Sequence, residues 1–351
     1  MEQPDPDREQ RVQALARDPL ARQFIEAAAT AVRHRDAGFP FTPVGGGWLR
    51  LPPGAHTDDT DMALGLLSAL READYAFDDL IVARNFADWV ASRPPDVGAS
   101  IRAVVGSPGF RTDPYAASRA FYESNRNRCA NGALMRNAIV AAVAPDLPTA
   151  FEWALKQGVL THYAPLSVVC CCLQAWLVFE TFEGRWPFAA HADWRAAWHG
   201  AWTAWVLACA DPVVAQWLED VEEGGMLDAA MDSLSKADFD PDSFDPFTHP
   251  DLPAKQGWVL LSLQVAVWAM QWCRRPAKDY PFEATGVLAP VADVFGRRGH
   301  DAIGWIPLVG HDSDTYGAIA GPMIAAACGR PFPRRMTETL AVKKVRWLYR
   351  E

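Results

Sequence analysis

The stretch GAHTDDTDMALGLLSAL, from Gly54 to Leu70, places three aspartates and two threonines at the start of an apolar helical pattern. A helix N-terminus carries a partial positive charge and four unpaired N–H groups, and one acidic or hydroxyl side chain is enough to cap it. Five such side chains in succession exceed what a cap requires. The stretch therefore predicts a helix and leaves open whether its first residues hold a cation.

Helical periodicity also dominates the rest of the chain, whereas alternating strand patterns are scarce. Half of the residues are hydrophobic, which is enough for a large core. We therefore expect one all-α domain covering residues 1–351. Its expected helices lie at about 15–33, 58–72, 76–92, 131–143, 148–157, 165–182, 187–209, 256–273 and 315–328.

The composition excludes several classes of function. A formal net charge of −10 argues against binding to nucleic acid or to an anionic membrane, because both depend on basic patches. Seven cysteines, three of them adjacent at residues 170–172, do not resemble the disulfide framework of a secreted protein. The polar start MEQPDPDREQ has no apolar signal-peptide region, so a cytoplasmic location is expected.

Three segments predict features of the fold. The apolar run from Pro165 to Phe179 is too short to span a bilayer and contains Gln174, so we expect a buried core helix. Tryptophans recur at helical spacing in a single stretch, which is typical of core packing, with a partner surface as the alternative. Residues 211–253 are rich in acid and proline and predict a solvated surface excursion. The recurring tryptophans are Trp194, Trp198, Trp202 and Trp205.

A second acidic segment occurs near the C-terminus, in LVGHDSDTYGAIAGPMIAAACG at residues 308–329. Asp312, Asp314 and Thr315 precede a helical pattern of small residues, which lets another helix approach closely. If the two acidic segments meet, Asp58 and Asp59 join them, and four clustered carboxylates require counter-cations. Hard oxygen ligands favour magnesium or manganese over zinc. Simple helix capping at each segment is the alternative.

Four motifs, HTDDTDMAL, NGALMR, THYAP and GHDSDTYGAIAG, resemble those of the ADP-ribosylglycohydrolases in their order and approximate spacing. The resemblance covers residues 54–329 and implies a compact orthogonal helical bundle with a cleft for two Mg²⁺ or Mn²⁺ ions. It implies catalytic roles for Asp58, Asp59 and Asp314, with Asp59 as acceptor of a proton from water. The implied metal ligands are Thr57, Asp58, Asp59, Asp312, Asp314 and Thr315.

The same resemblance implies that Asn131, Gly132 and His162 contact ADP-ribose. Glycine permits close approach of the backbone to a ligand, and a helix start offers N–H groups to phosphate. The family usually has glycine before the asparagine, where this chain has Ala130. Residues 1–50 lack the family's Gly-Asp-Ala-Leu-Gly motif and form a divergent segment, in which Glu26 is nearest in position to the acidic flap residue.

The function that the resemblance implies is metal-dependent hydrolysis that removes ADP-ribose from modified protein side chains, with arginine-linked mono-ADP-ribose as the expected substrate. The expected partners are an ADP-ribosylated protein and the ADP-ribose product. Three alternatives stay open. They are a hydrolase of serine-linked or other ADP-ribose conjugates, a catalytically silent ADP-ribose-binding module and a dinuclear-metal phosphohydrolase acting on a nucleotide.

Overall fold

The computed structural model describes residues 49–275 except 53, 191, 224, 247, 248 and 253, and further residues 303, 306–309 and 311–329. Within these residues the secondary structure is helical, with no β-strand and only isolated bridge residues, such as the pair Ala130 and Trp258. The all-α prediction is confirmed. The expected helix at 15–33 and Glu26 lie outside the described residues, and the single-domain extent over 1–351 stays a prediction.

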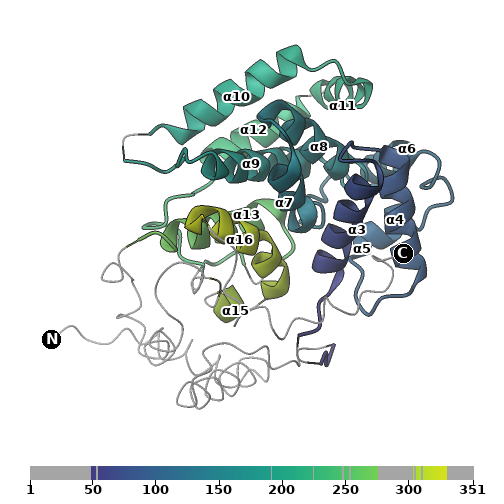
Figure 1. Cartoon of the computed structure of the whole chain (residues 1–351), viewed down its shortest axis with the longest axis horizontal. Helices are drawn as coiled ribbons and strands as arrows, with labels where there is room; N and C mark the ends of the chain where they lie inside the picture. The colour runs from purple at the N-terminus through teal and green to yellow at the C-terminus, as the bar shows by residue number, and fades with distance from the viewer. Residues whose placement is uncertain are drawn as a thin grey trace.

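The helices pack at varied angles around a shared hydrophobic core (Figure 1). Their bounds, in chain order, are α3 (Asp58–Glu72), α4 (Asp79–Ala91), α5 (Ala99–Val105), α6 (Pro114–Ser124), α7 (Leu134–Val143), α8 (Leu147–Val159), α9 (Pro165–Phe182), α10 (Trp194–Ala208), α11 (Pro212–Glu222), α12 (Met226–Lys236), α13 (Val259–Trp272), α15 (Ile306–Val309) and α16 (Ser313–Cys328).

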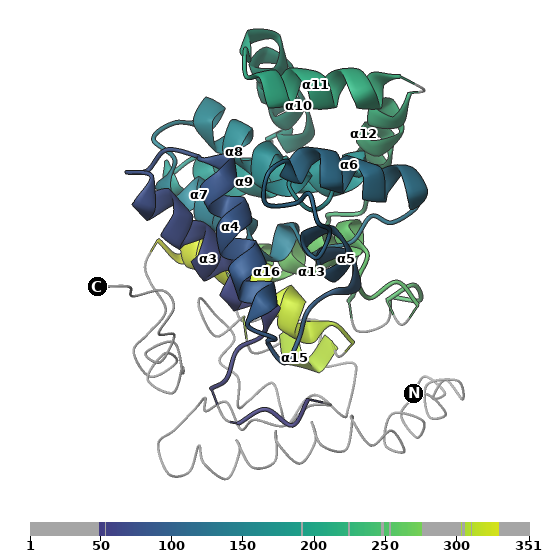
Figure 2. The same ribbon diagram turned by 90° about the vertical axis from the view of Figure 1, so that its right-hand side faces the viewer.

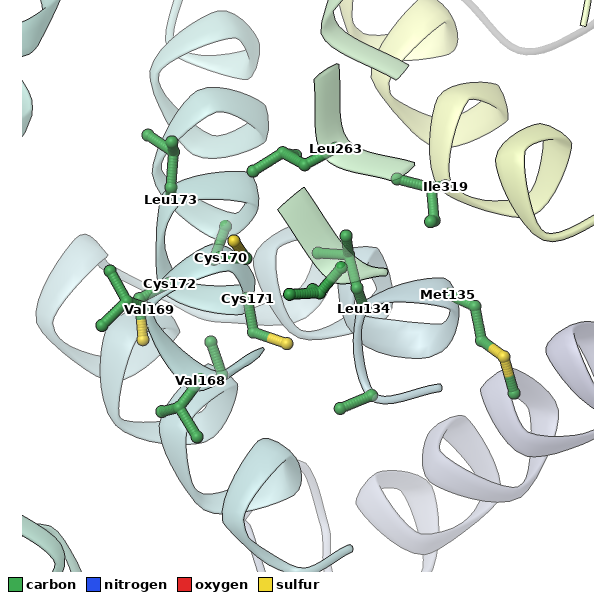
Figure 3. Packing of buried hydrophobic residues seen from close by; sticks show 14 of the residues in the cluster. Leu134, Met135, Val168, Val169, Cys170, Cys171, Cys172, Leu173, Leu263 and Ile319 are labelled. Atoms are coloured by element: carbon green, nitrogen blue, oxygen red, sulfur yellow. The ribbon is translucent and has the colours of Figure 1, made fainter. Parts of the chain in front are cut away.

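Helix α9 lies at the centre of the core. It is long and apolar enough to cross a membrane by length and composition, but 83% of its 18 residues are buried inside the protein. It contacts α7, α8, α12, α13 and α16. Figure 3 shows Cys170, Cys171 and Cys172 of α9 among apolar side chains, with Leu263 of α13 and Ile319 of α16 nearby. The prediction of a buried core helix is therefore confirmed.

The tryptophans of α10 also belong to the core. Trp198, Trp202 and Trp205 are buried, and each ring lies against Phe151 of α8 with centroids 5.4 to 6.2 Å apart. Trp194, at the start of the helix, is partly buried against the same core. Core packing, and not a partner surface, explains the spacing of these residues.

The expected surface excursion at residues 211–253 is wrong in part, because it contains α11 and α12. Trp217 on α11 is fully buried, and its indole N–H donates to the backbone oxygen of Tyr163 at 3.1 Å. Asp211 caps α11 by accepting from the backbone N–H groups of Val213 and Val214. Acidic residues that cap helices thus gave this segment the composition of a solvated loop.

Helices α3 and α16 contact one another although they lie near opposite ends of the described sequence (Figure 2). Helix α16 also packs against α7, α9, α13 and α15. Ala320 of α16 is fully buried in this packing, whereas a Cβ at Gly321 would make only an ordinary contact, 4.0 Å from Ile303 Cδ1. The acidic starts of α3 and α16 are thereby held by the core of the protein.

Candidate metal-binding and ADP-ribose site

The first acidic segment, residues 57–59, begins α3 without capping it. Thr57 occupies the N-cap position but makes no side-chain bond to the helix N–H groups. Its hydroxyl instead donates to Asp59 Oδ2 at 2.9 Å. Asp61, one turn further on, accepts from the indole N–H of Trp89 at 2.9 Å. The surplus polar residues at this helix start are therefore not used as caps.

Asp58 and Asp59 are buried, and the neighbouring acids make their ionisation costly. Burial is the largest cause that raises the pKa of Asp58 to about 6, and the charges of Asp96, Asp314 and Asp312 add to it. A hydrogen bond from the Gly98 N–H, at 3.0 Å, acts in the opposite direction and lowers this pKa. Burial and the charges of Asp58 and Asp314 raise the pKa of Asp59 well above its ordinary value.

The second acidic segment, residues 312–315, has the same character. Asp312 is the N-cap residue of α16 and likewise makes no capping bond. Its carboxylate accepts from Thr315 Oγ1 at 3.0 Å and from Asn131 Nδ2 at 2.7 Å. Burial is the main cause that raises the pKa of Asp312, and the charge of Asp314 adds to it. Capping of each helix, the alternative reading of these segments, accounts for neither of them.

The two acidic segments meet. The charges of Asp312 and Asp314 act on Asp58, and the Thr315 hydroxyl stabilises the ionised form of Asp59. Two of these acids, Asp58 and Asp59, are buried, and like charges held close to buried carboxylates favour either protonation or a bound cation. The arrangement brings together all six residues that the sequence singled out as metal ligands.

The donor set fits divalent magnesium or manganese, although the side chains do not form a finished site. In the part of the chain that is described, no three His, Cys, Asp or Glu side chains are already grouped as metal ligands. Among the residues that the structure describes, however, no donor bonds to Asp59 Oδ1, which is buried. A buried carboxylate oxygen without a donor is costly unless a cation or a water occupies its free side. Carboxylate and hydroxyl oxygens are ligands that Mg²⁺ and Mn²⁺ prefer.

Asp96 is a further acidic residue at this site that the sequence pattern did not reveal. It lies in the loop between α4 and α5, two residues before the Gly98 N–H that holds Asp58. Burial and the charge of Asp314 raise its pKa. The loop sequence RPPDVG resembles an ordinary turn, so its only signal is an aspartate close to a glycine.

Asn131 ties the second acidic segment to the loop before α7. Its amide nitrogen donates both to Asp312 and to Ser262 Oγ, the latter at 2.9 Å. Its backbone N–H donates to the oxygen of Gly257 at 3.1 Å. The amide N–H groups therefore position Asp312, which the sequence did not predict, and contact of Asn131 with ADP-ribose stays a prediction.

Gly132 and His162 lie against one another beside Asn131. A Cβ atom at Gly132 would lie 2.9 Å from His162 Cε1 and 3.0 Å from both His162 Nε2 and Ile101 Cδ1. Burial and the charge of Arg136 lower the pKa of His162 to about 3, so its ring is neutral. The structure thus places the three residues expected to contact ADP-ribose side by side, at the edge of the acidic cluster.

The all-helical fold and the contact between its two acidic helix starts agree with the family that comparison with known proteins assigns to this chain. The chain belongs to the family described as ADP-ribosylglycohydrolase, whose model matches residues 11–350.

One curated relative and one solved structure are similar to this chain. It is 37% identical over 145 residues to the ADP-ribosyl-[dinitrogen reductase] glycohydrolase of Rhodospirillum rubrum, an alignment covering 40% of this chain and 46% of that protein. The aligned part thus spans about half the length of this curated relative. A solved structure titled ADP-ribosylglycohydrolase-related protein complex has a TM-score of 0.51 and 22% identity, covering 86% of this chain and 82% of that one. The second likeness shows the shared all-α fold.

Proposed function

We propose that this chain is a divalent-metal-dependent hydrolase that removes ADP-ribose from modified protein side chains, with arginine-linked mono-ADP-ribose as its substrate. The observation that carries the proposal is the contact between the acidic starts of α3 and α16, bordered by Gly132 and His162. Family membership supports the removal of ADP-ribose. The Rhodospirillum rubrum relative carries the name of an enzyme of this kind.

Six side chains from the two acidic segments would hold two Mg²⁺ or Mn²⁺ ions. When bound, the ions would supply Lewis-acid polarisation at the ribose hydroxyls and fix the position of the sugar. They would also neutralise carboxylates that otherwise repel one another. The six residues are Thr57, Asp58, Asp59, Asp312, Asp314 and Thr315.

Cleavage of the glycosidic bond develops positive charge at C1″ of the ribose, and the surrounding carboxylates stabilise that charge. Water adds to C1″ and gives up a proton, while the bond from C1″ to the guanidine nitrogen breaks and that nitrogen takes up a proton. The sequence alone points to Asp59 as proton acceptor. We assign this step to Asp96, since Asp59 is buried among the metal ligands and Asp96 is not one of them.

The raised pKa of Asp96 suits it to accept a proton, because a more basic carboxylate accepts protons more readily. His162, neutral and adjacent to Gly132, would donate a hydrogen bond to an oxygen of the bound ADP-ribose. The chain retains all six proposed metal ligands, which favours an enzyme over a silent ADP-ribose-binding module.

The test is incubation of the full chain with arginine-linked and serine-linked ADP-ribosyl peptides, with Mg²⁺ or Mn²⁺ and after chelation, followed by mass spectrometry. We expect faster release from the arginine-linked peptide and loss of release after chelation. Equal or faster release from the serine-linked peptide would contradict the arginine assignment. Binding of ADP-ribose without release from either peptide would favour the silent module.

The Asp96→Asn variant tests the proposed proton acceptor in the same assay. It should bind ADP-ribose like the parent but release it at least about tenfold more slowly, since general-base assistance is typically worth that much or more. Asp232→Asn is the matched control, because Asp232 is an exposed residue of α12 paired with Lys236. A parental rate in the Asp96 variant would remove this residue from the reaction.

A further inference from the structure

Arg136 on α7 is a buried cation without a carboxylate partner in the described part of the chain. Its side chain is 1% exposed, and it lies directly below the proposed ADP-ribose site, because it bonds the backbone oxygen of Gly132 at 2.8 Å. Burying an arginine is costly, so a chain that retains one in its core must use all of its donors. The bonds of this guanidinium therefore define what Arg136 does.

All five guanidinium N–H donors of Arg136 have a partner. Nε donates to Gln157 Oε1 at 2.9 Å, and one Nη2 proton goes to the Gln157 backbone oxygen at 2.9 Å. The Nη1 group donates to the backbone oxygen of Gly132 and to Met62 Sδ, the latter at 3.7 Å. The remaining Nη2 proton goes to Thr161 Oγ1 at 2.7 Å. Arg136 thus joins the loop before α7 to the end of α8.

The bond to Thr161 determines where the Thr161 proton points. Arginine has donors only, so Thr161 Oγ1 must act as the acceptor toward Arg136. The Thr161 hydroxyl lies 2.8 Å from His162 Nδ1, which is the one other partner that the structure gives it. If Nδ1 carried a proton, the buried hydroxyl would have no acceptor. Thr161 therefore donates to Nδ1, and Nδ1 carries no proton.

The proton of the neutral His162 ring must then be on Nε2. No residue in the described ranges accepts a hydrogen bond from Nε2, and this atom lies beside Gly132, where a Cβ would be 3.0 Å away from it. His162 is 6% exposed, and its Nε2 is not among the fully buried polar atoms without a partner, so an oxygen of a ligand can reach this N–H.

We infer that Arg136, acting through Thr161, is a positioning residue that fixes His162 as the Nε2–H tautomer and so presents one N–H donor beside Gly132 to an oxygen of bound ADP-ribose. The ligand in this inference rests on the proposed function. The relay Arg136 to Thr161 to His162 rests on the hydrogen bonds alone.

The test is ¹⁵N NMR of the full chain labelled at histidine, recorded without ligand near neutral pH. The chain has eight histidines, and His162→Gln identifies the signals of His162. We expect a ring protonated at Nε2 only. In Thr161→Val, which keeps the shape and removes the hydroxyl, Nδ1–H should appear. Thr161→Ser, which restores the hydroxyl, should restore the parental spectrum.

Calorimetry with ADP-ribose completes the test. Thr161→Val should bind about tenfold more weakly than the parent, the size expected for one misplaced hydrogen bond, and Thr161→Ser should recover the affinity. A parental spectrum in Thr161→Val would overturn the relay, as would Nδ1–H in the parent, and parental affinity in Thr161→Val would overturn the contact of Nε2–H with ADP-ribose. A parent that shows the expected tautomer but binds no ADP-ribose would contradict the proposed function and the ligand named here, while supporting the relay.

Discussion

Asp59 is the residue whose surroundings most require a cation. Its Oδ1 is buried without a partner among the described residues, and its pKa is raised by burial and by two neighbouring acids. Asp59→Asn deletes one charge and nearly preserves the shape. We expect this variant, stripped of metal, to unfold at the same or a higher temperature than the parent. We also expect Mn²⁺ to raise its melting temperature far less, because a ligand stabilises the native state only as far as it binds.

Asp61→Asn is the control for this measurement, which is thermal unfolding with and without MnCl₂. Asp61 lies on the same helix, but it accepts a hydrogen bond from Trp89 and lies 3.0 Å from His56 Nδ1. Its variant should keep the parental shift with Mn²⁺. An equal shift in the Asp59 variant would show that Asp59 is not a ligand.

At the residue scale, most members of the candidate site could be proposed from the sequence, and their roles stay predictions. Asp58, Asp59 and Asp312 stood out because each occurs beside other acids at a helix start. Asp96 did not, since a single aspartate in a loop has no pattern, and only the fold brings it to the cluster. The bond from Asn131 to Asp312 was equally invisible, because it joins residues that are remote in sequence.

At the scale of elements, the loop before α7, the end of α8 and the helix α5 converge at Gly132. A methyl group at Gly132 would lie 2.9 Å from His162 Cε1 and 3.0 Å from Ile101 Cδ1. These distances are too short for contacts between carbon atoms. Gly132→Ala should therefore displace His162. We expect at least about tenfold weaker ADP-ribose binding and about 1–3 kcal/mol less stability, the usual cost of overpacking.

Calorimetry and urea unfolding measure these two effects. Gly200→Ala is the matched control, since a Cβ at this glycine of α10 meets nothing within 4 Å. Alanine in a helix interior should raise stability by about 0.5–1 kcal/mol and leave ADP-ribose binding unchanged. Parental affinity in the Gly132 variant would exclude this loop from the ligand site.

Long helices with a clear apolar period were predictable, and short or capped ones were not. The expected helices at 58–72 and 165–182 match α3 and α9. Helix α5 has only seven residues, which is too short to show a period. In α11, apolar residues such as Val214, Trp217 and Val221 recur at helical spacing, but the surrounding acids and prolines concealed the pattern.

For the whole molecule, the burial of Asp58 among other acids makes the stability of the metal-free protein depend on pH. The pKa of Asp58 rises from 3.8 to about 6 on folding. Between these values the folded chain binds more protons than the unfolded chain, so the free energy of unfolding falls as pH rises. The loss is complete above about pH 6 and amounts to at most roughly 3 kcal/mol for this group.

Urea unfolding of chelated protein between about pH 4 and pH 7 measures this effect, with Asp58→Asn as the comparison. The variant cannot ionise at this position, so it should gain stability relative to the parent as pH rises through the window, and Mg²⁺ should offset the loss in the parent. A difference between parent and variant that does not change with pH would contradict the account.

The contact between α3 and α16 is a property of the whole molecule that the sequence could suggest but not establish. Small residues in α16 indicated that another helix approaches closely, without saying which one. The aspartates at both helix starts would repel one another if the two starts met, and a shared cation would remove that repulsion. Only the packing of α16 against α7, α9 and α13 places its acidic start beside Asp58 and Asp59.

Helices α3 and α16 are proposed to hold divalent metal jointly, and anomalous X-ray scattering from crystals grown with Mn²⁺ would locate that metal. We expect manganese peaks about 2 Å from carboxylate oxygens of both acidic segments, with Asp58 or Asp59 on one side and Asp312 or Asp314 on the other. Crystals of an active protein with no peak there, or with a peak ligated by only one of the two helices, would contradict this proposal.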